Sequence, residues 1–299
     1  MKKNAVIYIS IISSALVIGG VGGVVAKRVL GKENIVYIGD SDSLQADSVE
    51  ILKRFNDYKG NEPTADFATW ELINVALEKY RNFDYSYSFA KGTAHTIVEQ
   101  EVRNFQIKNG DEYFEESLSK SSMVTVANRM YQSGVGGEVS IYKGSIPGQN
   151  VEETNFTDNP TKYTSEQYKE MLGRTLDQMF IYAISNKTIL TQKSTVLDSQ
   201  DVELYVELDP IKSTIDYQTQ MKNISNLDKR PVFEYVHLTF KTNKDYELIS
   251  LHVDEKYSAK MGFEVSINNI IDTEYYPNKK YEIPSYNGKL TYSAKGENE

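Results

Sequence analysis

This chain of 299 residues contains no cysteine. Disulfide bonds, thiolate nucleophiles and zinc sites with sulfur ligands are therefore excluded. Lipid attachment at a cysteine is excluded as well. Because no covalent cross-link is available, the burial of apolar side chains has to stabilise the fold.

The sequence also lacks the short motifs of common catalytic sites. It contains no GxSxG nucleophile elbow, no phosphate-binding loop and no HExxH zinc motif. The run Ser117-Leu118-Ser119-Lys120 matches the SxxK pattern of penicillin-recognising enzymes, but it lies in a predicted strand and not at a helix start. We therefore expect a protein that is not an enzyme and that uses no cofactor.

An excess of positive charge is missing too, because the formal net charge is -9. Nucleic-acid binding needs a positively charged surface, so this balance argues against a nucleic-acid partner. It also disfavours peripheral binding to anionic lipid.

Long apolar runs are confined to one place, residues 5–26, which contain no charged residue. Lys2 and Lys3 precede this run, and Lys27 and Arg28 follow it. A helix of roughly 20 apolar residues crosses a hydrocarbon core of about 30 Å. The run therefore predicts a single transmembrane anchor, and its position near the N-terminus predicts that the rest of the chain lies outside the cytoplasm. The basic residues on both sides leave a cytoplasmic location as the alternative.

Two further readings of the same run stay open. A cleaved secretory signal would also begin the chain in this way, with Val24-Val25-Ala26 as the cleavage site. Ala15, Gly19 and Gly23 place small residues on one helix face, a pattern that allows two membrane helices to approach closely. Glycine is also simply common in membrane helices.

Beyond the anchor, the order of hydrophobic patterns predicts an α+β domain built on a curved antiparallel sheet with inserted helices. We expect a basic segment at 1–4, the anchor at 5–26, a stalk at 27–43, the extracytoplasmic domain at 44–276 and a polar C-terminal tail at 277–299. A division into two domains near residue 150 fits the same order. Helices are expected over residues 44–58, 64–82, 164–186 and 210–226, and strands over 85–89, 95–108, 113–119, 123–131, 138–143, 193–207, 232–241 and 246–256.

The last hairpin has the clearest alternation of apolar and polar residues. If its turn centres between Asn243 and Lys244, Leu238 lies opposite Ile249 and Val236 lies opposite Leu251. The same alternation places His237, His252 and Asp254 together on the other face. Two imidazoles and one carboxylate form a weak candidate metal site, and a polar surface that binds no metal is the more ordinary interpretation.

A candidate ligand groove combines a strand with a helix. Tyr85, Tyr87 and Phe89 alternate with small polar residues, and Leu176, Met179 and Phe180 lie on the apolar face of the helix predicted at 164–186. Aromatic rings and methionine form adaptable apolar surfaces, so these six residues are the expected lining. Packing of the strand under a helix, with no ligand, is the alternative.

Asp40 and Asp42 follow a short apolar strand, an arrangement that superficially resembles the acidic motif of haloacid-dehalogenase phosphatases. Gly39 interrupts the motif, and the chain lacks alternating strand–helix units. A solvated helix cap is the better explanation of these aspartates. A hydrolase that uses Asp40 and Asp42 is therefore kept only as a third hypothesis.

Two segments carry a resemblance to a known family, namely residues 109–114 (NGDEYF) and 231–240 (PVFEYVHLTF). With the order of elements over residues 65–275, they resemble the LolA-type half-barrel lipoproteins and lipoprotein carriers. That resemblance implies a curved sheet that holds an acyl chain or another apolar ligand against helices. The order also resembles the single-pass, nuclear-transport-factor-like component of conjugative secretion machines. Both are likenesses of pattern, and no functional residue transfers from either.

Together these observations predict a non-enzymatic, membrane-anchored extracytoplasmic protein that holds a lipid or another apolar ligand between its sheet and helices. The alternative is a protein-interaction subunit of an envelope or conjugative secretion assembly. The expected partners are the membrane, through the N-terminal helix, and either an apolar ligand or an envelope protein.

Overall fold

The computed structural model describes residues 41–96, 99–121, 125–146, 150–172, 174–178, 180–225, 227–261 and 263–291. Within this part of the chain, twelve strands form one antiparallel sheet in the order β6-β5-β4-β3-β2-β1-β12-β11-β10-β9-β8, with β7 paired to β5. The strands are β1 (Tyr85–His95), β2 (Glu99–Asn109), β3 (Glu112–Ser121), β4 (Thr125–Ser133), β5 (Val139–Ser145), β6 (Asn155–Phe156), β7 (Thr161–Tyr163), β8 (Ile189–Val196), β9 (Val202–Leu208), β10 (Val232–Thr242), β11 (Leu248–Met261) and β12 (Phe263–Pro277).

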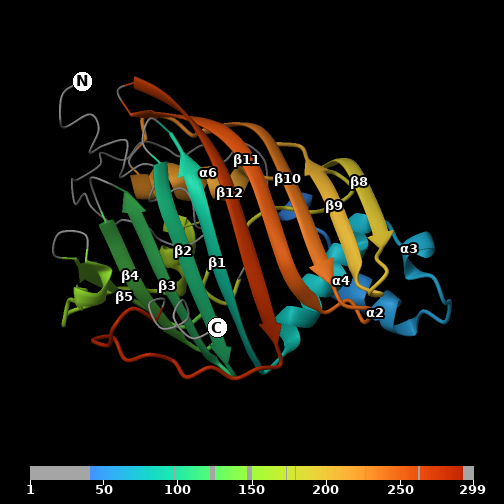
Figure 1. Cartoon of the computed structure of the whole chain (residues 1–299), viewed down its shortest axis with the longest axis horizontal. Helices are drawn as coiled ribbons and strands as arrows, with labels where there is room; N and C mark the ends of the chain where they lie inside the picture. Colours follow the sequence, from blue (N-terminus) through green and yellow to red (C-terminus); the bar gives the residue numbers. More distant parts are fainter. Residues whose placement is uncertain are drawn as a thin grey trace.

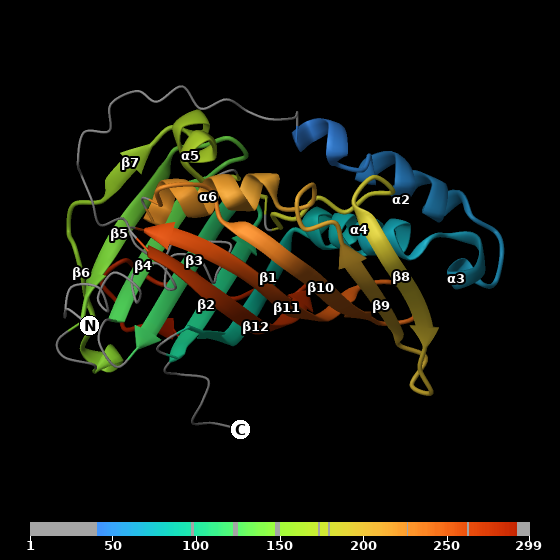
Figure 2. The ribbon, with the colours of Figure 1, turned by 90° about the horizontal axis from the view of Figure 1, so that it is seen from above.

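The helices lie on one side of this sheet, which curves around them (Figures 1 and 2). The predicted α+β class with an antiparallel sheet is thus confirmed. We call the face toward the helices concave and the other face convex. The helices are α2 (Ser48–Asp57), α3 (Pro63–Asp66), α4 (Thr69–Asn82), α5 (Ser165–Leu172) and α6 (Ile215–Ser225), with short 3-10 turns η1 (Ser41–Leu44) and η2 (Val151–Glu153).

Two meanders, β1 to β5 and β8 to β12, meet where β1 pairs with β12. Strands from both sides of residue 150 therefore belong to the same sheet. The segment between the meanders carries α5 and returns the chain to the opposite edge at β8. Among the described residues, the largest apolar cluster lies between α2, α4 and the second meander, and it includes Leu72 and Ile73 of α4 and Leu238 and Phe240 of β10.

The register predicted for the β10–β11 hairpin is wrong by four residues. Leu238 lies opposite Val253, and Phe240 lies opposite Leu251. The turn is longer than expected, because the Asn243 side chain accepts hydrogen bonds from the amides of Asp245 and Glu247, each at 2.9 Å. A shift by an even number of residues leaves every side chain on its predicted face.

The long helix predicted at 164–186 ends at Leu172. Its start is as expected, because Thr164 and Gln167 form the predicted capping box, with hydrogen bonds of 3.0 and 3.2 Å. Glycine follows Leu172 in the sequence, and glycine commonly ends helices. Beyond it, Arg174 forms an ion pair with Glu115 on β3.

The other predicted helices differ mainly at their boundaries. The helix expected at 64–82 is divided into α3 and α4, and α2 begins at Ser48 where a start at residue 44 was expected. The Asp47 side chain caps α2 by accepting a hydrogen bond from the Glu50 amide at 3.0 Å. The helix expected from residue 210 begins only at Ile215, because the preceding residues form turns on Asp209.

The tail predicted to begin at residue 277 packs across the convex face of the first meander up to Thr291. The Tyr281 ring contacts the rings of Phe105 and Tyr87, with centroid distances of 4.9 and 5.2 Å. Leu290 is buried beside Leu118 and Ala127. The tail therefore covers apolar surface of the sheet that no helix covers among the described elements.

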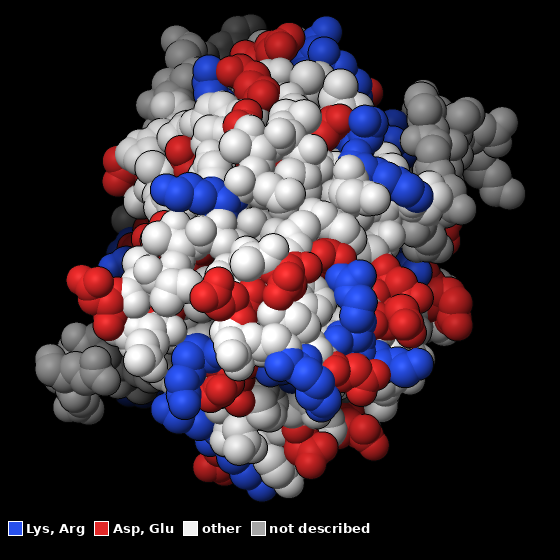
Figure 3. Space-filling view, turned by 90° about the vertical axis from the view of Figure 1, so that its right-hand side faces the viewer, with Lys and Arg blue, Asp and Glu red and all other residues white. Residues whose placement is uncertain are grey.

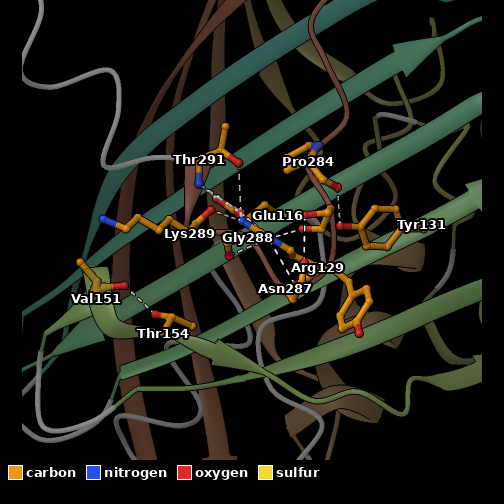
Figure 4. A network of polar contacts seen from close by, with 12 residues as sticks. Glu116, Arg129, Tyr131, Val151, Thr154, Pro284, Asn287, Gly288, Lys289 and Thr291 are labelled. Atoms are coloured by element: carbon orange, nitrogen blue, oxygen red, sulfur yellow. Dashed lines mark hydrogen bonds and ion pairs between the residues drawn. The ribbon is translucent and has the colours of Figure 1, made fainter.

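A buried ion pair holds this tail (Figure 4). Arg129 on β4 lies 2.8 Å from Glu116 on β3, and neither side chain is accessible to solvent. The Arg129 guanidinium donates to the carbonyl oxygens of Ser285 at 2.6 Å and Gly288 at 2.9 Å, and also to that of Lys289. The Thr291 amide donates to Glu116 at 2.9 Å. Backbone groups of the tail thus satisfy charges that the tail itself buries.

Replacing Arg129 by methionine should lower the free energy of unfolding by about 3–5 kcal/mol, because Glu116 would remain buried without a counter-charge. Arg103→Met is the matched control, since Arg103 pairs with Glu101 at a partly exposed site on the same face. The control substitution should lower the free energy of unfolding by less than about 1 kcal/mol. Chemical denaturation measures both values, and equal losses in the two variants would contradict this account.

Candidate functional site

One hollow among the described residues lies between α4, the segment 174–184 and the middle of the sheet. We call it the helix–sheet cleft. Its outer part has a volume of about 300 Å³, and an inner part of about 100 Å³ adjoins it. Both parts are lined by Arg174, Phe180, Ile181, Tyr182 and Tyr275.

Helix α4 forms one wall because its two faces differ. Leu72, Ile73 and Ala76 are fully buried in the core, whereas Leu77 is partly exposed and turns toward the helix–sheet cleft. Glu78 and Arg81 lie near the same opening and form an ion pair at 3.2 Å. An amphipathic helix of this kind places its apolar stripe on the core and its polar edge at the cleft.

The segment 174–184 forms the opposite wall, and its described residues, 174–178 and 180–184, have no regular secondary structure. Asn74 of α4 donates to the carbonyl of Ile184 at 2.9 Å, and the amide of Ala183 donates to the carbonyl of Ser213 at 2.9 Å. Thr188 also donates to the Ala183 carbonyl at 2.8 Å. These bonds fix the backbone of the segment, so the side chains of the wall have defined positions.

A buried ion pair anchors the start of this segment to the sheet. Arg174 lies 2.7 Å from Glu115 on β3, and both side chains are at most 2% exposed. Asn104 and Gln106 on β2 donate to the same carboxylate at 2.9 and 3.0 Å. Burial disfavours the charged guanidinium, but the nearby Glu115 carboxylate keeps the pKa of Arg174 above its usual value.

A second buried carboxyl, Glu255 on β11, lies behind the inner part of the cleft. It accepts hydrogen bonds from the Tyr182 hydroxyl at 2.7 Å, the Asn269 amide at 2.9 Å and the Tyr217 hydroxyl at 3.1 Å. Burial raises the pKa of Glu255 to about 7, although these three donors lower it. Burial likewise raises the pKa of Tyr182 and of Tyr217 well above the usual value, so both phenols keep their protons and act as donors.

The structure does not bring the six predicted groove residues together. Tyr87 and Phe89 pack on the convex face beneath the tail, and Tyr85 is 39% exposed. Phe180 lines the helix–sheet cleft, whereas Leu176 is buried in a separate cluster with Tyr168 of α5. Met179 lies outside the described residues. On β1 the small residues Ser86 and Ser88 face the helices, so the tyrosines point the other way.

The candidate metal ligands also have separate partners. His252 Nδ1 lies 2.7 Å from Asp272 Oδ1, and the His237 ring stacks on Tyr235 at 4.7 Å. Asp254 accepts a hydrogen bond from the Tyr235 hydroxyl at 3.0 Å. Within the described ranges, no group of three histidine, aspartate or glutamate side chains is arranged to hold a metal ion.

The predicted anchor at 5–26, with Ala15, Gly19 and Gly23, lies outside the described residues, as does Asp40. Asp42 belongs to the turn η1. None of the helices in the described part of the chain is long and apolar enough to cross a membrane.

Sequence reasoning missed the two buried carboxyls and Arg174. For Glu255 a signal existed, because it shares the inward face of β11 with Leu251, Val253 and Tyr257. An acidic residue at an inward strand position is unusual unless it is hydrogen-bonded. For Arg174 and Glu115 no signal existed, since they pair across 59 residues of sequence.

The chain matches no protein-family model, and it matches none of the curated proteins.

Replacing Glu255 by glutamine should flatten the pH dependence of stability. With a native pKa of about 7 against an ordinary 4.5, the folded protein binds more protons than the unfolded chain between these values. The free energy of unfolding of the wild type should therefore fall by about 3 kcal/mol as the pH rises through this interval.

Denaturant unfolding at pH 5 and pH 8 measures this effect. In the Glu255→Gln protein, the free energy of unfolding should fall much less between these pH values. At pH 8 this variant should be more stable than the wild type. The control Asp254→Asn removes a carboxyl from the other face of β11. Because the Asp254 charge is the smallest of the causes that act on the pKa of Glu255, this variant should keep most of the decline. An equal decline in wild type and Glu255→Gln would rule out Glu255 as its source.

Proposed function

We propose that this protein is a non-enzymatic binding protein that holds a small amphiphilic ligand in the helix–sheet cleft. The observation that supports this most is the composition of the cleft. Phe180, Ile181 and Tyr182 contribute apolar and aromatic surface, while Glu78 and Arg81 carry charge at the opening. Ligand sites typically combine an apolar lining with a few polar groups that orient the ligand.

The size of the cleft bears on the ligand. Its outer part of about 300 Å³ is at the lower end of the range for small-molecule sites, roughly 300–1,000 Å³. The inner part adds about 100 Å³. This favours a compact molecule, or one end of a longer one, over a whole lipid with several acyl chains. If the ligand is a lipid, the cleft has room for its headgroup or for a single short chain.

The buried ion pair Arg174–Glu115 supports a binding role. The two side chains lie 2.7 Å apart, and the side-chain amides of Asn104 and Gln106 also donate to Glu115. Both charges are therefore satisfied without a ligand. Such a pair fixes the wall of the site in its binding geometry, and preorganised walls bind with less loss of conformational entropy.

We further propose that residues 5–26 anchor the protein in a membrane, with the domain from residue 44 onward outside the cytoplasm. The support is the uncharged run itself and its basic flanks. The anchor would hold the cleft close to the membrane surface, where small amphiphiles are concentrated.

A role as an interaction subunit is the second candidate, and one feature favours it. Strand β8 is an edge of the sheet, and its Leu190 and Val196 are each 58% exposed. Figure 3 views the molecule from the side of β8 and α3 and shows uncharged surface between interspersed acidic and basic side chains. Exposed strand edges can pair with a strand of another protein.

Filling the cleft tests the binding role. Leu77→Trp adds bulk to the wall of the cleft, and Val49→Trp adds the same group on the exposed face of α2, where Val49 is 64% exposed. Native mass spectrometry of the full chain should detect a co-purified small molecule in wild type and Val49→Trp, and its loss in Leu77→Trp. A ligand retained by all three proteins, or absent from wild type, would contradict the proposal. The second candidate predicts no difference among them.

Membrane attachment has its own test. The full chain should sediment with membranes, resist a high-salt wash and be released by detergent, because a spanning helix is held by apolar burial. Deletion of residues 5–26 should move the protein to the supernatant. Protease added to intact cells should digest the domain of the full chain, and protection from that protease would place the domain in the cytoplasm.

A further inference from the structure

Aromatic rings surround the junction between the two parts of the helix–sheet cleft. Phe180, Tyr182 and Tyr275 line both parts, while Tyr80 lines the outer part and Tyr217 the inner one. The ring centroids of Phe180 and Tyr182 lie 5.4 Å apart, those of Tyr182 and Tyr217 5.5 Å, and those of Tyr80 and Tyr275 5.0 Å. A ligand that spans both parts of the cleft therefore lies against these rings.

Two of these rings are held by a buried carboxyl. The hydroxyls of Tyr182 and Tyr217 donate to Glu255 at 2.7 and 3.1 Å. A phenol that donates to a carboxylate gains electron density in its ring, which makes the negative face of the ring more attractive to a cation. The hydrogen bonds also fix both rings with their hydroxyls turned toward the sheet, away from a ligand.

The charges around the cleft favour a cation as well. The basic side chains Arg81 and Arg174 are paired with Glu78 and Glu115, at 3.2 and 2.7 Å. Asp177 and Asp216 also line the outer part, against one further basic residue, the exposed Lys169. Even without Glu255, four carboxylates lie around the cleft against three basic side chains.

We infer that the helix–sheet cleft takes a cationic amine of the quaternary or alkyl ammonium class, with its charge against the rings of Phe180, Tyr182 and Tyr275. This inference rests on the proposed binding function and names its ligand class. Aromatic cages bind quaternary ammonium groups through the ring quadrupole and desolvate the cation at little cost. The inner part, lined also by Leu251, Val253 and Ile271, receives the apolar end of the ligand.

Three probes of similar shape and different charge test whether the cleft prefers a cation. Choline is cationic, 3,3-dimethylbutan-1-ol replaces its nitrogen by carbon, and 3,3-dimethylbutyrate carries a negative charge. Each is titrated by calorimetry into the full chain in a maltoside detergent, which contains no ammonium group. Choline should bind roughly 2- to 30-fold more tightly than the alcohol, the range that corresponds to a cation–π contribution of about 0.5–2 kcal/mol. The butyrate should bind most weakly.

A matched pair of variants tests whether choline binds in the helix–sheet cleft. Phe180→Leu removes a ring from the cleft and keeps an apolar side chain, while Phe89→Leu makes the same change on the convex face. Phe180→Leu should lower the affinity for choline roughly 2- to 30-fold, and it should change the affinity for the alcohol by less than about twofold. Phe89→Leu should change neither. The wild-type comparison of the three probes needs no variant, so it holds even where a variant is unstable.

The outcomes separate this inference from the proposed function. Equal or tighter binding of the alcohol or the butyrate overturns the cationic class and leaves a binding cleft in place. Choline binding that survives Phe180→Leu and Leu77→Trp unchanged overturns the site. Absence of binding by every probe, with a different small molecule found in the cleft by native mass spectrometry, overturns the ligand class alone. Absence of both overturns the proposed function as well.

Discussion

Ten consecutive residues of β1, from Ser86 to His95, pair with β12, and this ladder joins two meanders that are distant in sequence. At its centre the strands approach so closely that a Cβ on Gly92 would lie 2.3 Å from the Ile270 carbonyl oxygen. Only glycine fits there without moving the backbone of β12. The curved sheet, and with it the helix–sheet cleft above β1 and β12, depends on this contact.

A sheet of this length has two faces, and the chain covers them by different means. Helices cover the concave face, and α4 supplies apolar side chains such as Leu72 and Ile73 to the core. On the convex face, the C-terminal tail covers the rings of the first meander and is held by Arg129 and Glu116. The convex face of the second meander stays polar and exposed, as the position of His252 indicates. The cleft forms on the concave side, where α4 and the segment 174–184 do not close completely over the sheet.

Both buried acids near the cleft serve the same purpose by different chemistry. Glu115 forms an ion pair with Arg174 at 2.7 Å, so the two buried charges compensate each other. Glu255 is held by neutral donors, and burial raises its pKa to about 7. Each acid ties a part of the cleft wall to the sheet, Glu115 at the start of the segment 174–184 and Glu255 at Tyr182. Polar contacts thus hold this wall in place, since its described residues form no helix or strand.

Local patterns in the sequence predicted much of this fold. The hairpin at Asn109-Gly110 is present, with Gly110 at a φ of +59° as a tight turn requires, and the capping box at Thr164 starts α5 as expected. The alternation around Tyr87 correctly predicted a strand, but period two does not say which face meets the helices.

Other features do not follow from the alternation of apolar and polar residues. The length of the β10–β11 turn depends on local hydrogen bonds that the Asn243 side chain accepts. The pairing of Arg174 with Glu115 joins residues that are 59 positions apart in the sequence. Of the predicted groove residues that the structure describes, only Phe180 lines the helix–sheet cleft, and the other residues of the cleft come together only in three dimensions.

Hydrogen–deuterium exchange of the full chain, with and without saturating choline, tests the central claim that the helix–sheet cleft is the binding site. Backbone amides of the segment 174–184 and of the C-terminal half of α4 should exchange more slowly with choline present, because the ligand contacts both walls at once. The convex face and the tail from residue 278 should not change. Unchanged exchange at 174–184, or protection confined to the convex face, would contradict the account.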